Sequence, residues 1–242
     1  PFVRKVWIFL KEKGLEFEHR QLDPLDKTER FLAMNPAGRI PVLEEPAGNF
    51  IADSSVICDY LERVHPDPAL IPADHRQRAR ALWLEEYADT ALTTLCARIY
   101  WMFILIPART GEPVDQQAVA EFKAEQFPGV FDYLESIAPD GDAIVNDHFS
   151  IADIALAAAV RLLDLAGDPL DAQRWPRFAA YYQRTISRPS ARSIAEIDIA
   201  TTEVWRTHGQ RPADRPALNR SQRGGQPHST GPHRRKAERD TG

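Results

Sequence analysis

The sequence predicts a fold in two parts, an α/β unit followed by an all-helical bundle. As far as residue 66, apolar residues alternate between helical and extended spacing in the order αβαββα, which indicates an α/β unit. From residue 76 to about residue 205, apolar spacing is helical throughout. The proline-rich stretch 65–72 separates the two parts. We therefore predict an N-terminal domain over 1–66, a linker over 67–75, a helical domain over 76–206 and a disordered tail over 207–242.

The first predicted element is an amphipathic helix that ends at Gly14. Its apolar positions follow the spacing i, i+3, i+4, i+7 and are Val3, Val6, Trp7 and Leu10. Residues 17–22 are then expected to form a short strand, and residues 28–34 a short helix.

A hairpin and a third helix complete the α/β unit. Two extended pieces, 41–44 and 49–52, flank the turn signal Pro46-Ala47-Gly48. The run Asp53-Ser54-Ser55 then opens a helix with apolar residues at helical spacing.

The second part is predicted to be a bundle, with helices over 76–104, 114–137, 150–165, 175–186 and 189–197. Pro128 is expected to kink or divide the second of these. Ser150 and Asp153 have the spacing of a capping box, which is a folding signal rather than a catalytic one.

Composition excludes several classes of protein. Hydrophobic residues make up 43% of the chain and charged residues 27%, as in globular domains. The longest apolar run, 99–108, is about half of what a bilayer-spanning helix needs, so we predict no membrane partner. The cysteines, Cys58 and Cys96, provide no disulfide framework and favour a cytoplasmic location; both are expected to be buried rather than nucleophilic. The histidines lack metal-ligand spacing, so we predict no metal site.

Charge is distributed unevenly along the chain. From residue 207 onward there are eight Lys or Arg and three Asp or Glu, so the net charge of −5 divides into +5 there and −10 before it. The net charge of −10 on residues 1–206 argues against a nucleic-acid partner.

The segment Asn35–Glu44, followed by Asp53-Ser54, carries the most functional information. Pro41 can begin a strand, where its missing N–H is tolerated. A cis Ile40–Pro41 bond would turn the N–H and C=O of Val42 toward a ligand, although the sequence alone does not favour cis. Asp53 and Ser54 stand at a helix N-terminus, where free N–H groups attract an anion. The alternative interpretation is that either residue only caps the helix.

The sequence NPAGRIPVLE at 35–44, the following Asp-Ser pair and FSIADIAL at 149–156 together resemble the cytosolic glutathione transferases, over about residues 1–205. This resemblance implies a thioredoxin-like N-terminal domain of order βαβαββα that binds glutathione, an all-helical C-terminal domain that holds an electrophile, and a homodimer. Glutathione is then a co-substrate, and no other cofactor is implied.

The resemblance assigns glutathione contacts to Arg39, Ile40, Pro41, Val42, Asp53 and Ser54. It makes Pro41 the family's cis-proline and pairs the Val42 main chain with the cysteinyl backbone of glutathione. Ser54 and the N-terminus of the helix that it opens would take the γ-glutamyl carboxylate, and Asp53 would face the ammonium group. Relatives often carry Glu where this chain has Asp53, and the shorter side chain is expected to weaken binding. Arg39 lies where relatives hold the glycyl carboxylate; alternatively it is a solvated surface charge.

The implied chemistry is activation of the glutathione thiol. A cysteine-like thiol has a pKa of about 8.5, which a hydrogen-bond donor aimed at the sulfur lowers, and the thiolate then attacks an electrophilic carbon. In serine-type relatives the donor directly precedes a Pro-Phe pair, which Pro1-Phe2 resembles. Residues 1–27 contain no Ser, Thr, Tyr or Cys. We therefore expect the catalytic residue and the family's first strand to lie upstream of Pro1, the chain being N-terminally truncated.

The predicted function is a glutathione transferase that conjugates glutathione to small hydrophobic electrophiles in detoxification. Tyr100 and Trp101 are candidates for the electrophile pocket, or alternatively plain core residues. The first alternative function is a non-catalytic binding or regulatory protein of the same fold. The second is a thiol-dependent reductase or dehalogenase.

Deletion of residues 207–242 is predicted to leave the melting temperature nearly unchanged, because this segment contains almost no apolar residues to bury. Thermal unfolding followed by circular dichroism, with the full chain as the control, measures the effect. A fall of many degrees would show that the segment is folded.

Overall fold

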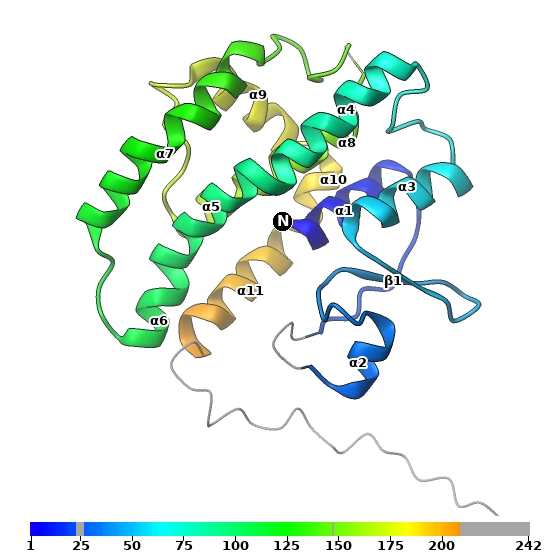
Figure 1. Cartoon of the computed structure of the whole chain (residues 1–242), viewed down its shortest axis with the longest axis horizontal. Helices are drawn as coiled ribbons and strands as arrows, with labels where there is room; N and C mark the ends of the chain where they lie inside the picture. Colours follow the sequence, from blue (N-terminus) through cyan, green and yellow to red (C-terminus); the bar gives the residue numbers. More distant parts are fainter. Residues whose placement is uncertain (23–26, 147, 209–242) are drawn as a thin grey trace, which may run out of the picture. The chain divides into compact units, whose positions relative to one another are not determined.

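The N-terminal part of the protein contains the three predicted helices and the predicted pair of strands after the second helix. The computed structural model describes residues 1–22, 27–146 and 148–208. Helix α1 (Phe2–Glu12) is followed by α2 (Glu29–Met34), the strands β1 (Val42–Glu44) and β2 (Phe50–Ala52), and α3 (Ser54–Val64) (Figure 1). Gly14 has a φ of +67°, the left-handed conformation typical of a residue just past a helix end.

Helix α1 is buried on two sides rather than along the single predicted stripe. Val6 and Leu10 are buried as expected, but Ile8 and Phe9 are also buried. The reason is that α1 contacts both α3 and α8. As a consequence, the charged side chain of Lys5 is buried inside the protein as well.

The predicted hairpin is confirmed. β1 and β2 pair antiparallel, with Val42 opposite Ala52 and Glu44 opposite Phe50. In the turn, the Gly48 N–H donates to the Glu45 carbonyl at 2.8 Å. The register therefore places Val42 directly beside the end of β2, from which α3 begins.

The strand predicted over residues 17–22 is wrong for this structure. Within the described residues the sheet consists of β1 and β2, and neither pairs with 17–22. A strand depends on a ladder of hydrogen bonds to a neighbour, and none of the described residues forms such a ladder with this segment. Side chains hold it to α1 instead: the Phe17 ring meets the Trp7 ring edge-on at 4.7 Å between centroids, and Lys11 Nζ lies 5.0 Å from the Phe17 ring centre.

One long helical rod begins the second part and extends beyond the predicted end at residue 104. It comprises α4 (His75–Tyr87), the π-helical turn η1 (Ala88–Leu92), α5 (Thr93–Tyr100), a second π-helical turn η2 (Trp101–Leu105) and α6 (Ile106–Thr110) (Figure 1). The turn η2 directly precedes α6, so Pro107 stands in the first turn of a new helical segment, where its missing N–H costs least. Gly111, with a φ of +75°, ends the rod.

By length and composition, this rod of 36 residues is apolar enough to cross a membrane. The core helices of globular domains satisfy the same criterion, and 44% of the most apolar window is buried inside the protein. Both α4 and α5 contact helix α8, so their apolar faces serve the internal core.

The remaining predicted helices are α7 (Gln116–Ile137), α8 (Ile151–Ala166) and α9 (Pro176–Ile186). Pro128 does not divide α7. The flanking Phe127 and Phe131 are fully buried, and their rings contact each other at 4.9 Å between centroids, which holds the helix across the missing hydrogen bond. The Ser150–Asp153 capping box at the start of α8 is confirmed.

The helix predicted over 189–197 is divided into α10 (Pro189–Arg192) and α11 (Ala195–His208). Ser193 lies at the break: its hydroxyl donates to the Ser190 carbonyl at 2.6 Å and accepts from Trp7 Nε1 at 2.8 Å. The bond to Ser190 closes the end of α10, and the bond from Trp7 attaches this point to α1. The residues from 209 onward, and with them nearly all of the predicted tail, lie outside the described residues.

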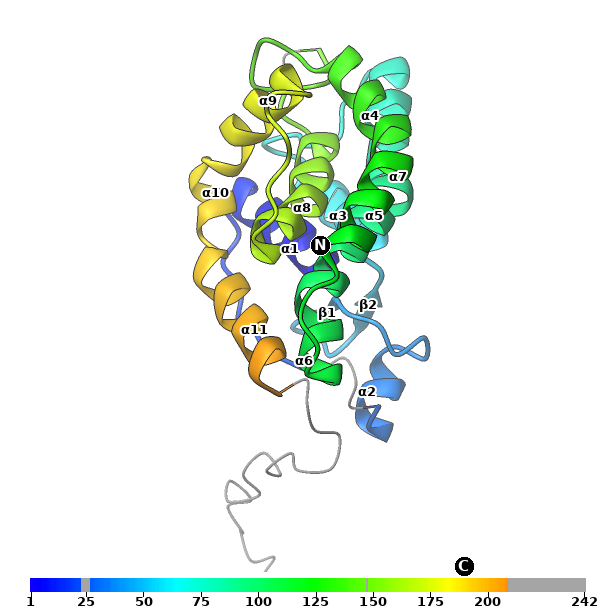
Figure 2. The same cartoon turned by 90° about the vertical axis from the view of Figure 1, so that its left-hand side faces the viewer.

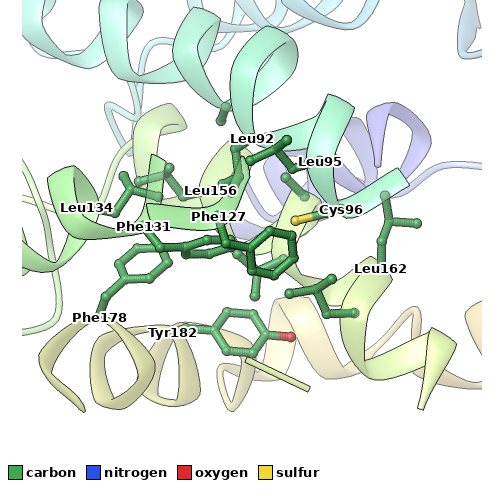
Figure 3. Close-up of a cluster of buried hydrophobic side chains, with 14 of the residues drawn as sticks. Leu92, Leu95, Cys96, Phe127, Phe131, Leu134, Leu156, Leu162, Phe178 and Tyr182 are labelled. Carbon is green, nitrogen blue, oxygen red and sulfur yellow. The ribbon is translucent and has the colours of Figure 1, made fainter. Parts of the chain in front are cut away.

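Helix α8 lies between the helices α9 and α10 on one side and α4, α5 and α7 on the other (Figure 2). It contributes to two apolar clusters. One joins α8 to α5, α7 and α9 and includes the aromatic rings of Phe127, Phe131 and Phe178 (Figure 3). The other joins α8 to α1, α3 and α4. The described residues accordingly form one compact unit.

An ion pair attaches the end of α1 to the residues before α10. The Glu12 carboxylate accepts from Arg188 Nη2 at 2.8 Å and Nε at 2.9 Å, and also from the Ser190 hydroxyl. Partial burial acts to raise the pKa of Glu12, but these hydrogen bonds outweigh it, and the pKa lies below the ordinary value of 4.5. An acid whose pKa is lowered in the folded state stabilises the fold at pH values above its ordinary pKa, and this contribution is lost as the pH falls through the lowered pKa.

Glu12→Gln is predicted to lower the free energy of unfolding at pH 7 by about 1–3 kcal/mol, the range for hydrogen bonds to a charged group. The difference from wild type should shrink as the pH falls below 4.5 and through the lowered pKa, because wild-type Glu12 is then protonated too. Urea unfolding at several pH values tests this, with exposed Glu86→Gln as the control. A difference that is independent of pH would contradict the prediction.

Candidate functional site

The loop between α2 and β1 is organised by Asn35, a residue that the sequence analysis did not single out. Asn35 is 6% exposed; its Nδ2 donates to the Arg39 carbonyl at 2.8 Å, and its Oδ1 accepts from the Ala37 N–H at 3.0 Å. Asparagine commonly forms such turns with its own backbone, so an Asn-Pro pair before Gly was the available signal. The side chain holds the backbone of Arg39 in place ahead of β1.

Gly38 is required by its conformation and its surroundings. Its φ is +59°, and a Cβ there would lie 3.1 Å from the Lys27 side chain and 3.3 Å from that of Leu32. Lys27 Nζ donates to the Gly38 carbonyl and lies 5.5 Å from the centre of the Phe31 ring. Lys27 thus places a second cation next to Arg39, whose side chain is exposed.

The Ile40–Pro41 peptide bond is cis, as the family resemblance implied. Pro41 precedes Val42, the first residue of β1. Because Val42 pairs with Ala52, the backbone of Val42 and the N-terminus of α3 are brought to the same edge of the hairpin. Two sequence motifs that are separated by nine residues therefore meet at one place.

Asp53 caps helix α3. Its Oδ1 accepts from the Ser55 N–H at 2.9 Å and from the Val56 N–H at 3.2 Å. Its backbone has a φ of +77° and a ψ of 131°, which is a strained conformation for a residue other than glycine. Such strain persists only where the surrounding structure enforces it, and it is concentrated at functional sites.

Ser54 does not cap the helix. It is 4% exposed, and neither its hydroxyl nor its N–H has a hydrogen-bond partner among the described residues. A nearly buried hydroxyl and a free N–H at the positive end of a helix form a site suited to an anion. Each of the two interpretations of Asp53-Ser54 therefore applies to one residue. Asp53 caps the helix, and Ser54 is available to a ligand.

Beneath this site lies a buried cluster that sequence analysis also missed. Lys5 of α1 reaches Ser55 of α3 and the carboxylates of Glu85 and Asp89 on the α4–η1 rod. The available signal was the apolar pair Ile8 and Phe9, which lies three and four residues beyond Lys5 and so places this lysine on a buried face.

Tyr100 and Trp101 are adjacent in sequence, but the structure places them in different surroundings. The Tyr100 hydroxyl donates to Thr202 Oγ1 of α11 at 3.1 Å, and burial raises its pKa. Trp101 is 47% exposed and lines a hollow of about 460 Å³ between α5 and α7, together with Arg98 and Phe122. Of the two residues, Trp101 lines this hollow, and Tyr100 is not among its lining residues.

Both cysteines are buried, as expected. Burial raises the pKa of the Cys58 and Cys96 thiols far above the ordinary value, so neither supplies a thiolate at neutral pH. Within the described part of the chain, no cluster of three or more His, Cys, Asp or Glu is arranged to hold a metal ion.

Family models match both parts of the chain. Residues 1–64 match the glutathione S-transferase N-terminal domain, and residues 116–184 match the glutathione S-transferase C-terminal domain. The chain is 31% identical to mouse glutathione S-transferase theta-3 over 75% of this chain and 76% of that protein. It is also 31% identical to the uncharacterised GST-like protein YibF of Escherichia coli, over 68% of this chain and 78% of YibF.

Solved structures of similar proteins have the same fold. A glutathione S-transferase from Rhodospirillum rubrum is 30% identical, with a TM-score of 0.72, over 80% of this chain and 87% of that one. A glutathione S-transferase from Methylobacillus flagellatus with glutathione bound is 29% identical, with a TM-score of 0.66, over 80% and 93%. The β-etherase LigF from a Sphingobium strain is 28% identical, with a TM-score of 0.64, over 80% and 93%.

Proposed function

Since the chain belongs to the glutathione S-transferase family, we propose that it binds glutathione between the Arg39–Val42 segment and the N-terminus of α3, and conjugates it to small hydrophobic electrophiles. The observation that carries the proposal is Ser54. This nearly buried residue has a hydroxyl and an N–H without partners among the described residues, at the positive end of α3. The γ-glutamyl carboxylate is the anion that these groups would bind.

The remaining contacts follow from the same edge of the hairpin. Val42, held beside Ala52, offers its main chain to the cysteinyl backbone of glutathione. Arg39 is exposed, and Lys27 lies next to it on the Gly38 carbonyl, so two cations stand near the place for the glycyl carboxylate. The exposed Asp53 carboxylate retains oxygen lone pairs beyond its two capping bonds and would accept from the γ-glutamyl ammonium group.

Catalysis requires a donor to the glutathione sulfur, which stabilises the thiolate and lowers its pKa. Residues 1–27 contain no hydroxyl or thiol side chain, so none of them supplies a donor of the serine, tyrosine or cysteine type. In the serine-type relatives that the chain resembles, the donor stands immediately before the residue that corresponds to Pro1. The thiolate would attack the electrophile as a nucleophile. Trp101, beside the hollow between α5 and α7, is the candidate surface for the apolar part of the electrophile.

The alternative is a protein of the same fold that binds glutathione without catalysing conjugation. Incubation with glutathione and a panel of small aryl halides and enones, analysed by mass spectrometry for thioether products, separates the two. Thioether formation above the uncatalysed rate supports the transferase. Tight binding of glutathione without any product supports the binding protein.

Ser54→Ala is predicted to weaken glutathione binding by about 1–3 kcal/mol, because a hydrogen bond to a carboxylate is lost. Isothermal titration calorimetry with reduced glutathione measures the change in Kd. The matched control is Ser136→Ala, an exposed serine of α7 that is remote from the site in sequence and bonds only to the Tyr133 carbonyl among the described residues. An unchanged Kd for Ser54→Ala would refute the site.

We also propose that the protein is a homodimer that uses exposed apolar side chains on β2, α3 and α4. These are Phe50, Val56, Val64 and Trp83. An ion pair of 2.9 Å between Asp59 and Arg78 joins α3 to α4, so the two helices present neighbouring surfaces. Large apolar side chains that a chain leaves exposed are candidates for burial in an interface.

Light scattering after size exclusion is predicted to give about twice the chain mass of 27.3 kDa for the wild-type protein. Trp83→Glu should shift the protein toward the monomer, because it introduces a charge into the apolar surface. Trp101→Glu, at an equally exposed tryptophan of the same helical rod, should leave the mass unchanged. A wild-type mass of one chain would contradict the proposal.

A further inference from the structure

Lys5 is a buried cation that the proposed chemistry does not use. Its side chain is 1% exposed. Nζ donates to Ser55 Oγ at 3.1 Å, to Glu85 Oε1 at 2.5 Å and to the Asp89 carboxylate. One ammonium group therefore bridges α1, the first turn of α3 and the α4–η1 rod.

The cluster stays charged in spite of its burial. Desolvation acts to lower the pKa of Lys5, but the carboxylates of Glu85 and Asp89 outweigh it, and the pKa is raised. A buried ammonium is tolerated only where ionic partners and hydrogen bonds compensate its lost hydration. The Ser55 hydroxyl completes the arrangement, because it also donates to Glu85 Oε1 at 2.5 Å.

The cluster acts on the turn that carries the ligand groups. Ser55 is held from two sides: its N–H donates to Asp53 Oδ1 at 2.9 Å, and its hydroxyl accepts from Lys5. Ser54 lies between Asp53, which is strained, and Ser55, which is anchored. The neighbours Asp53 and Ser55 therefore set the orientation of the unpartnered hydroxyl and N–H of Ser54. Of these two neighbours, Ser55 is held by Lys5.

We infer that Lys5 is a positioning residue, which orients the first turn of α3 through Ser55 so that Ser54 meets the ligand carboxylate. This inference rests on the proposed function. The simpler explanation is that Lys5 only joins three elements of the core. The two explanations predict different effects on glutathione binding when a substitution of Lys5 is compared with one elsewhere that lowers the stability by the same amount.

The chain offers a matched control at the C-terminal end of the same helix. Lys13 directly follows α1, its side chain is 0% exposed, and Nζ pairs with Glu62 of α3 at 2.7 Å. It also donates to the carbonyls of His65 and Pro68, each at 2.7 Å. Lys13 is thus as buried and as fully paired as Lys5, but it holds the C-terminal end of α3 rather than its first turn.

Lys5→Met and Lys13→Met are predicted to lower the melting temperature alike, whereas only Lys5→Met should raise the Kd for glutathione, by about tenfold, as expected for a misdirected hydrogen bond to a charged group. Calorimetry with reduced glutathione measures the Kd. Equal effects of both variants on the Kd would overturn the inference, because Lys5 would then act through general stability alone.

A smaller change tests the same step if Lys5→Met fails to fold. Ser55→Ala removes the hydroxyl that accepts from Lys5 and donates to Glu85, which leaves the Lys5 ion pairs in place, and is expected to raise the Kd several-fold with little change in melting temperature. Ser55→Thr, which keeps the hydroxyl, should restore binding. A wild-type Kd for Ser55→Ala would overturn the inference.

Hydrogen exchange separates failure of the inference from failure of the proposed function. Amides of residues 54–57 should exchange faster without ligand in Lys5→Met, or in Ser55→Ala, than in Lys13→Met. If wild type does not bind glutathione, the proposed function fails, and equal exchange in the variants would overturn the positioning role by itself.

Discussion

The burial of helix α8 is the constraint on which the rest of the structure depends. Nearly every side chain from Ile151 to Leu163 is buried, and the helix contacts α1, α4, α5, α9 and α11. A helix that is apolar on all sides has no stable position except inside a bundle. Its start is set by Asp153, which accepts from the Ser150 N–H, the Ile144 N–H and the Tyr181 hydroxyl. The Ile151 N–H donates to the Leu70 carbonyl, so the same helix end also anchors the chain that links the two parts.

Helix α1 of the glutathione-transferase N-terminal region packs directly on α8 of the helical part, so the two parts share a core. Arg4 shows this directly: it donates to the Ala158 carbonyl of α8 at 2.6 Å and forms a bidentate pair with Asp198 of α11. Lys5, one residue later, extends to the α4–η1 rod. Consecutive residues of one helix therefore carry charges into two different contacts of the helical part, and each charge is compensated where it is buried.

The candidate site is assembled where these contacts end. Asn35 and Gly38 shape the loop before the cis Ile40–Pro41 bond, the hairpin register brings Val42 to the start of α3, and Asp53 takes the capping bonds there. This division leaves Ser54 with unused hydrogen-bonding groups in a nearly buried position. A helix terminus that is capped from outside and anchored from inside can offer such groups to a ligand without prior rearrangement, which reduces the entropy cost of binding.

Local physical chemistry allowed the sequence to determine much of this protein. Helical spacing and capping signals predicted α1, α3, α8 and α9, and the Pro-Ala-Gly turn predicted the hairpin, because these depend on residues close together in the chain. The motifs around Pro41 and Ser54 identified the family, to which both parts of the chain belong. Three features were decided by the tertiary structure. The segment 17–22 lacks a strand because pairing needs a neighbour, the helix over 189–197 is broken because Ser193 bonds to Trp7, and Lys5 is buried because α1 packs on two sides. The first two depend on residues distant in the chain, whose meeting no local pattern encodes. For Lys5, local spacing indicates a buried face, but its ionic partners Glu85 and Asp89 come from a distant segment.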